Sequence, residues 1–116
     1  MKMLKWLWVP AVMAVLPSCM TSESLYSWHD YEKTTYQYSK KWTDELKMSV
    51  LEEFQKMIGE QNGLRRVAPP GMYAEYGYML YRTGKKEEGI RMMKEEINWY
   101  PESEKYISRI IKQLEE

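Results

Sequence analysis

Apolar positions along the chain follow two different patterns. Trp6 to Pro17 form one unbroken apolar run, and Lys2 and Lys5 precede it. Beyond Thr43 the apolar residues instead recur at intervals of three and four, as in the stripe Leu46, Val50, Leu51, Phe54, Met57 and Ile58. Positions with that spacing share one face of a helix, so the pattern predicts amphipathic helices in the second part of the chain.

Capping and breaking residues mark the ends of these expected helices. Thr43 is suited to the N-cap position, and two acidic residues follow it, where the helix dipole favours negative charge. Gly59 and Gly63 can end this helix. We expect residues 59–69 to form a loop and Pro69-Pro70 to open the next helix, because proline is tolerated in a first turn.

The segments on either side also favour helix. Between residues 28 and 42 aromatic residues recur at roughly helical spacing, and the charges between them do not alternate as a strand would require. At the other end Ser103 can cap a last helix, whose apolar stripe is Tyr106, Ile107, Ile110, Ile111 and Leu114. The expected fold class is therefore all-α.

The stretch from about residue 70 to 103 resembles a tetratricopeptide repeat, which has about 34 residues and two antiparallel helices. Its large, small and closing positions fall here on Tyr73, Tyr76, Gly77, Leu80, Gly89, Met93 and Pro101. Gly77 and Pro101 match by identity, and the others match by size. The resemblance implies close approach of the two helices at Gly77 and Gly89, with Gly84 ending the first helix in a left-handed cap. The last helix would then serve as a C-terminal capping helix.

The N-terminal apolar run is too short to cross a bilayer as a helix, which takes about 20 residues. A positive start, a short apolar run and small residues form the order of a secretory signal. The run ends in Leu16-Pro17-Ser18-Cys19, which resembles a bacterial lipobox, although proline is unusual there. An ordinary signal peptide with an incidental cysteine is the alternative. The lipobox interpretation explains the single cysteine, whose thiol would carry lipid and anchor the chain in a membrane.

This interpretation divides the chain into a signal peptide over residues 1–18, a tether over 19–26 and a helical domain over 27–116. Met20 follows the cysteine. Resemblance to lipoprotein sorting in enteric bacteria implies that an aspartate there would retain the protein in the inner membrane. We therefore expect a lipid-anchored protein in the periplasmic leaflet of the outer membrane.

Nearly all of the chain after Cys19 resembles one family. The most specific part of the resemblance is the run from Ala68 to Tyr78, and Leu25 to Trp28 and Tyr100 to Ser103 also match. The chain is similar to the small lipoproteins of domain-of-unknown-function family 4810. The family has no established activity. Its members are often encoded beside a lipoprotein that resembles the curli secretion channel subunit, which implies a shared envelope complex.

Charge and composition exclude several classes of function. The chain has 17 basic and 17 acidic residues, so nothing indicates the basic face that a nucleic-acid-binding protein needs. His29 is the only histidine and has no cysteine partner, so no metal site or other cofactor is expected. The adjacent pairs Glu52-Glu53, Glu87-Glu88 and Glu95-Glu96 are interpreted as solvated helix faces, because neighbouring helical residues do not face one another. No catalytic residues are assigned, and the protein is not expected to be an enzyme.

Two functions remain open at the level of sequence. The first is a non-enzymatic adaptor or assembly factor with envelope protein partners, and the second is a periplasmic lipoprotein that binds a peptide, glycan or lipid fragment. In tetratricopeptide proteins the first helix of each pair lines a groove, which here implies Ala74, Tyr78, Tyr81 and Arg82. Tyr78, Tyr81 and Arg82 are the candidate partner-binding residues, since tyrosine and arginine are typical of interface hot spots. The aromatic segment from Trp28 to Trp42 is the other candidate face.

Overall fold

The computed structural model describes residues 24–116, which form helices without a strand. Its elements are α2 (Tyr31–Lys41), α3 (Asp44–Gly59), α4 (Met72–Arg82), α5 (Lys86–Trp99), the short 3-10 helix η1 (Pro101–Ser103) and α6 (Glu104–Glu115). The all-α prediction is confirmed. The predicted signal peptide over residues 1–18 and Cys19 lie outside the described residues.

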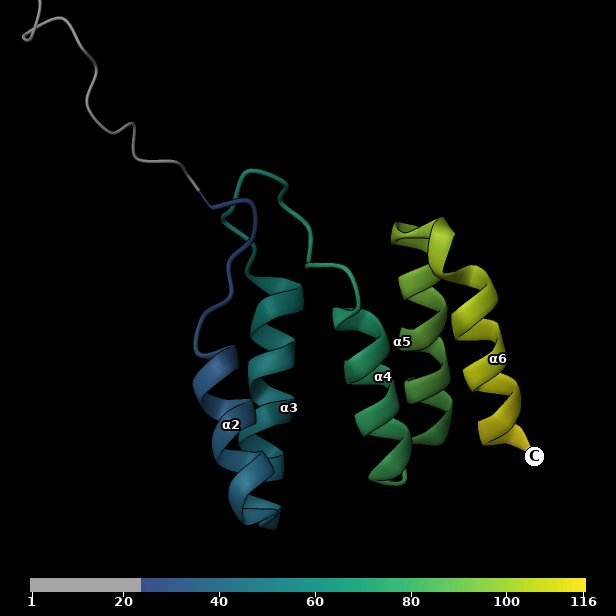
Figure 1. Cartoon of the computed structure of the whole chain (residues 1–116), viewed down its shortest axis with the longest axis horizontal. Coiled ribbons are helices and arrows are strands. Elements are labelled where there is room, and N and C mark those ends of the chain that lie inside the picture. The colour runs from purple at the N-terminus through teal and green to yellow at the C-terminus, as the bar shows by residue number, and fades with distance from the viewer. Residues whose placement is uncertain (1–23) are drawn as a thin grey trace, which may run out of the picture.

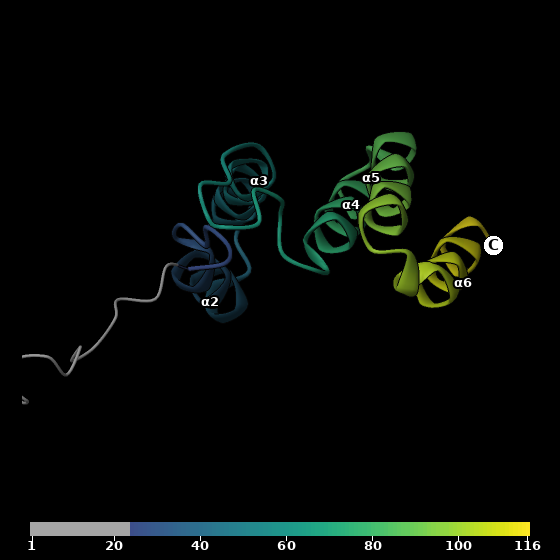
Figure 2. The same cartoon turned by 90° about the horizontal axis from the view of Figure 1, so that it is seen from above.

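The helices stand side by side in a row from α2 at one end to α6 at the other (Figure 1). Seen from above, they alternate between two layers, with α2, α4 and α6 along one side and α3 and α5 along the other (Figure 2). Within residues 24–116, no helix has both the length and the apolar character needed to cross a membrane.

The core lies where α3 meets α4. It contains the buried residues Val50, Leu51, Phe54, Met57, Ala68, Met72, Tyr76 and Leu80. Four of them come from the apolar stripe predicted for α3, while the other two stripe residues, Leu46 and Ile58, are half-buried. The helix also starts as predicted, because the Thr43 hydroxyl accepts a hydrogen bond from the Leu46 N–H at 3.3 Å. Helical periodicity therefore located this core face correctly.

The contact between α4 and α5 is the most extensive in the row. It depends on two glycines, Gly77 and Gly89, which are both buried. A Cβ atom on Gly77 would lie 2.5 Å from the Gly89 carbonyl oxygen, and a Cβ on Gly89 would lie 2.5 Å from the Gly77 carbonyl oxygen. The close approach expected at these two positions is confirmed. Gly84, with φ of +100°, follows α4 in the left-handed conformation that was predicted for it.

Two predicted helix starts differ in detail from the structure. The prolines Pro69-Pro70 precede α4 instead of forming its first turn, and Gly71, with φ of +91°, takes the N-cap position. Ser103 does precede α6, but its hydroxyl donates to the Tyr100 carbonyl at 2.7 Å instead of capping that helix. The Ser103 hydroxyl therefore bonds within the turn of η1, and it does not cap α6.

The residues at the end of the predicted tether belong to the folded part of the chain. The carbonyl oxygens of Ser24 and Leu25 accept hydrogen bonds from Leu64 and Arg65, each at 3.1 Å. Gly63 makes this approach possible, because a Cβ there would lie 2.5 Å from the Leu25 carbonyl oxygen. The entering chain is thus held against the loop that joins α3 to α4.

Candidate functional site

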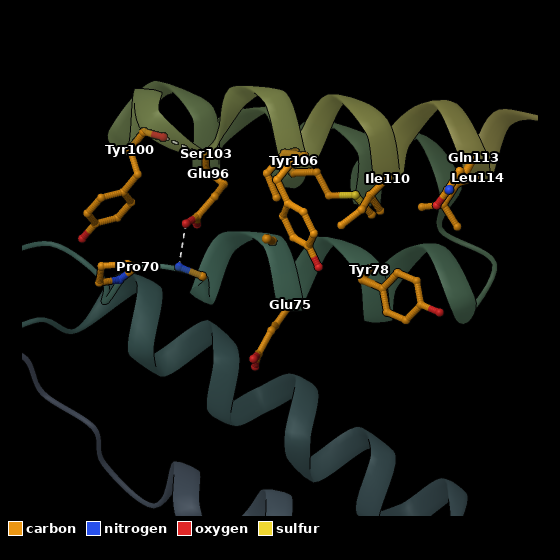
Figure 3. Close-up of a pocket in the computed structure, with 14 residues that line it drawn as sticks. Pro70, Glu75, Tyr78, Glu96, Tyr100, Ser103, Tyr106, Ile110, Gln113 and Leu114 are labelled. Atoms are coloured by element: carbon orange, nitrogen blue, oxygen red, sulfur yellow. Dashed lines mark hydrogen bonds between the residues drawn. The ribbon is translucent and has the colours of Figure 1, made fainter.

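A groove runs between α4 and α6, and α5 forms its floor (Figure 3). We call it the C-terminal groove. Its volume is about 770 Å³, within the range of small-molecule and peptide sites. It is lined by Pro70, Gly71, Ala74, Glu75, Tyr78, Met93, Glu96, Tyr100, Ser103, Tyr106, Ile107, Ile110, Gln113 and Leu114.

The walls of the groove are mainly apolar and aromatic. On the α6 wall, Ile107 is buried, Ile110 is half-buried and Tyr106 is 67% exposed. On the α4 wall, Ala74 is half-buried and Tyr78 is 43% exposed. The amphipathic stripe predicted for the last helix therefore packs only partly, and its remaining apolar surface faces the open groove (Figure 3).

Glu96 lies on the floor and is only 2% exposed. Its Oε1 atom accepts a hydrogen bond of 2.6 Å from the N–H of Gly71, the residue that precedes α4 (Figure 3). The positive end of a helix dipole favours an anion at this position. Oε2 is also buried, yet it has no hydrogen-bond partner among the described residues.

The first helix pair contains a matching arrangement. Glu53 of α3 is 6% exposed, and its Oε1 accepts a hydrogen bond of 2.8 Å from the N–H of Asp30, which precedes α2. In both pairs a glutamate of the second helix thus holds the start of the first. The interpretation of Glu52-Glu53 and Glu95-Glu96 as wholly solvated faces is wrong for the second member of each pair. No local signal identified them, because the partner N–H lies more than 20 residues away in sequence.

Comparison with protein families gives one match, to the model described as a domain of unknown function, DUF4810, over residues 25–110. The chain belongs to this family. Comparison with curated proteins and with solved structures gives no significant match. The matched part of this DUF4810 protein contains both buried glutamates, the α4–α5 crossing and most of the C-terminal groove.

The three residues predicted to bind partners lie in different surroundings in the DUF4810 protein. Tyr78 lines the C-terminal groove. Tyr81 is half-buried against Gly89, and its hydroxyl donates to the Leu114 carbonyl at 2.6 Å, which ties α4 to the end of α6. Arg82 is exposed at the end of α4 and does not line the groove. The structure therefore brings Tyr78, and not the other two, to this site.

Tyrosines near the groove have raised pKa values. Burial, followed by the charges of Glu95 and Glu96, raises the pKa of Tyr73. Burial also raises the pKa of Tyr100, with smaller contributions from Tyr26 and Glu96. The Tyr100 hydroxyl donates to the carbonyl of Ala68 at 2.6 Å. These phenols stay protonated at neutral pH, as the donated hydrogen bond of Tyr100 requires.

The other candidate face lies at the opposite end of the row. Trp28, Tyr36 and Trp42 are 47%, 58% and 73% exposed. The ammonium of Lys40 lies 4.7 Å from the centre of the Tyr36 ring, a cation–π distance. Tyr36 and Trp28 line two separate pockets of about 520 and 610 Å³, and both of these are smaller and more open than the C-terminal groove.

Metal-ligating side chains do not gather in the part of the chain that the structure describes. No group of three or more acidic, histidine or cysteine side chains lies close enough to hold an ion there. His29 is exposed, and its Nε2 atom lies 2.9 Å from the Glu60 carbonyl oxygen. Its contact therefore joins the start of the fold to the end of α3.

Proposed function

We propose that this protein is a non-enzymatic, lipid-anchored adaptor or assembly factor of an outer-membrane lipoprotein complex. The observation that carries the proposal is the C-terminal groove, whose apolar walls remain open beside the exposed rings of Tyr78 and Tyr106. Aromatic residues with this exposure are enriched in protein interfaces. The family resemblance adds a candidate partner, a lipoprotein that resembles the curli secretion channel subunit.

We further propose that the helix pairs are tetratricopeptide-like repeats with α6 as the terminal helix. The two buried glutamates support this, because Glu53 and Glu96 hold the start of the first helix in their respective pairs. The glycine crossing of α4 and α5 supports it as well. In such a stack the first helices line a common binding side, which agrees with the arrangement of α2, α4 and α6 in Figure 2.

The proposed anchor rests on the sequence before residue 24. The apolar run from Trp6 to Pro17 and the lipobox-like ending support acylation of Cys19. Acyl chains stabilise membrane binding by roughly 0.8 kcal/mol for each buried methylene group. An adaptor held in the periplasmic leaflet of the outer membrane would meet other lipoproteins in two dimensions, which raises its effective concentration toward them.

The second candidate function is a periplasmic ligand-binding lipoprotein. The volume of about 770 Å³ favours it, because that space also suits a peptide, glycan or lipid fragment. Purification of the intact protein from gently solubilised envelopes separates the two functions. The adaptor proposal predicts protein partners in stoichiometric amount, whereas a co-purifying small molecule without protein partners would favour the ligand-binding function.

A further inference from the structure

We infer that the C-terminal groove binds a partner segment in which a lysine or arginine is flanked by apolar side chains, with its cation on Glu96. This inference rests on the proposed adaptor function and specifies the chemistry of the partner. It begins with the Oε2 atom of Glu96, which is buried without a hydrogen-bond partner among the described residues. Such a group costs free energy unless a donor reaches it, so its presence calls for an explanation.

Helix capping accounts for only one oxygen of this carboxylate. Oε1 accepts the hydrogen bond from Gly71. Glu53 makes the equivalent contact with Asp30, and it leaves no buried oxygen unpaired. The capping role is therefore common to both helix pairs, whereas among the described residues the buried unpaired oxygen occurs on α5, which forms the groove floor. Because Glu96 lines the groove, a donor that enters the groove can approach this carboxylate.

The acidic lining of the groove favours an occupant with a positive charge. Its charged lining residues are Glu75 and Glu96, and no basic residue lines it within the described part of the chain. Oε2 of Glu75 already accepts a hydrogen bond of 2.8 Å from the Tyr31 hydroxyl. Glu75 is also exposed, so water can solvate its other oxygen, whereas the unpaired oxygen of Glu96 is buried. Ammonium and guanidinium groups are the donors that make the strongest hydrogen bonds to a carboxylate.

The apolar walls of the groove favour apolar side chains in the rest of the bound segment. Ile107, Ile110 and Tyr106 offer apolar surface on α6, and Tyr78 offers it on α4. A lysine or arginine has a long apolar stem that can lie along such walls while its charged end reaches Glu96. Neighbouring apolar residues of the same segment would cover the remaining surface. A partner chain fits this combination better than a polar glycan, which would leave the apolar walls uncovered, or an anionic lipid headgroup, which Glu75 and Glu96 would repel.

The test titrates the intact chain in detergent micelles with three capped pentapeptides, Leu-Ala-X-Ala-Leu, where X is lysine, norleucine or glutamate. The readout is the δ1-methyl NMR signals of isotope-labelled isoleucines. Ile107 and Ile110 report on the groove, and Ile58 on α3 serves as an internal control. We expect the lysine peptide to shift the two groove methyls and to bind at least tenfold more tightly than the norleucine peptide. The glutamate peptide should bind most weakly.

Two variants test whether the preference for the lysine peptide depends on the Glu96 carboxylate. Glu96→Gln keeps an oxygen that can accept from Gly71, and it should abolish the lysine preference while the Ile58 signal stays in place. The matched control Glu75→Gln should retain the preference. Equal binding of the lysine and norleucine peptides to the wild type would overturn the inference without reference to any variant. Loss of preference in Glu75→Gln alone would also overturn it.

Two further outcomes identify other occupants and would likewise overturn the inference. Saturable shifts of the groove methyls by hexylamine, as tight as those by the lysine peptide, would indicate a small-molecule amine site. Shifts of Ile107 and Ile110 that depend on protein concentration alone would indicate a second copy of the chain. The assay needs no envelope partner, so its failure is distinguishable from failure of the adaptor function, which co-purification measures.

Discussion

Gly77 and Gly89 lie in direct backbone contact where α4 crosses α5. Each glycine occupies the space that a Cβ atom on the other would need, since the nearest carbonyl oxygen lies 2.5 Å from either ideal Cβ position. Behind this crossing, Met93 is 1% exposed, and it lies on the floor of the C-terminal groove. A Cβ on Gly77 would also lie 2.9 Å from Met93 Cγ, so the crossing supports the floor of the groove.

We predict that Gly77→Ala lowers the free energy of unfolding by about 1–3 kcal/mol, because the added methyl group overpacks the crossing. The gain in helix propensity, about 1 kcal/mol, offsets part of the effect. Gly59→Ala is the matched control, since no atom beyond its chain neighbours and its own helix backbone lies within 4 Å of its ideal Cβ. Chemical denaturation should show no loss of stability in the control. Equal midpoints for Gly77→Ala and wild type would contradict the packing described for α4 and α5.

Tyr100→Phe tests the link between α5 and the loop that precedes α4. The Tyr100 hydroxyl donates to the carbonyl of Ala68, a residue that is 1% exposed. Removing the hydroxyl leaves a buried acceptor unpaired, which should cost about 1–3 kcal/mol. Tyr36→Phe is the control, because that ring is 58% exposed and its change should stay within about 0.5 kcal/mol. Similar denaturation midpoints for the two variants would argue against a structural role for the Tyr100 hydroxyl.

The pKa of Tyr31 gives a pH-dependent prediction. Burial, and then the hydrogen bond and charge of Glu75, raise this pKa from 10.0 to about 12. Because the folded state holds the proton more tightly, this stabilising contribution is fully present below pH 10 and is lost as the pH rises to about 12. A tyrosine 13Cζ NMR titration should give the raised midpoint in the wild type and a lower one in Glu75→Gln. Identical midpoints would exclude an effect of the Glu75 carboxylate.

Cys19→Ala tests the proposed anchor. Only the wild type should incorporate a clickable fatty acid, because the thiol is the proposed acylation site. The variant should also remain uncut, since the lipoprotein peptidase acts on the acylated precursor. Gel fluorescence after metabolic labelling measures the first effect and gel mobility the second. Equal labelling of variant and wild type would end the lipoprotein proposal.

Local patterns in the sequence predicted the helices and part of the packing. The apolar stripe of α3, the Thr43 cap and the contact of Gly77 with Gly89 each depend on residue type at short, regular spacing. Such features follow from helical periodicity and from the small size of glycine. They located the buried face and the start of α3 and the crossing of α4 with α5.

The groove could be predicted only in part. Tyr78 was expected on the open side of α4, and it lines the groove. Burial of Glu96 was not expected, because it depends on how the start of α4 packs against α5, and adjacent glutamates are usually solvated. The tie between Tyr81 and the Leu114 carbonyl was missed for a similar reason, since it depends on where α6 packs.

The most direct test of the central claim is the amount of protein partner that co-purifies with groove variants from gently solubilised envelopes. Tyr78→Ala should reduce recovery at least tenfold, because Tyr78 lines the groove, while Arg82→Ala should leave it within twofold of wild type. Unchanged melting temperatures and helical circular dichroism would exclude unfolding as the cause. The absence of a stoichiometric partner in the wild type, or its loss in Arg82→Ala alone, would contradict an adaptor that acts through the C-terminal groove.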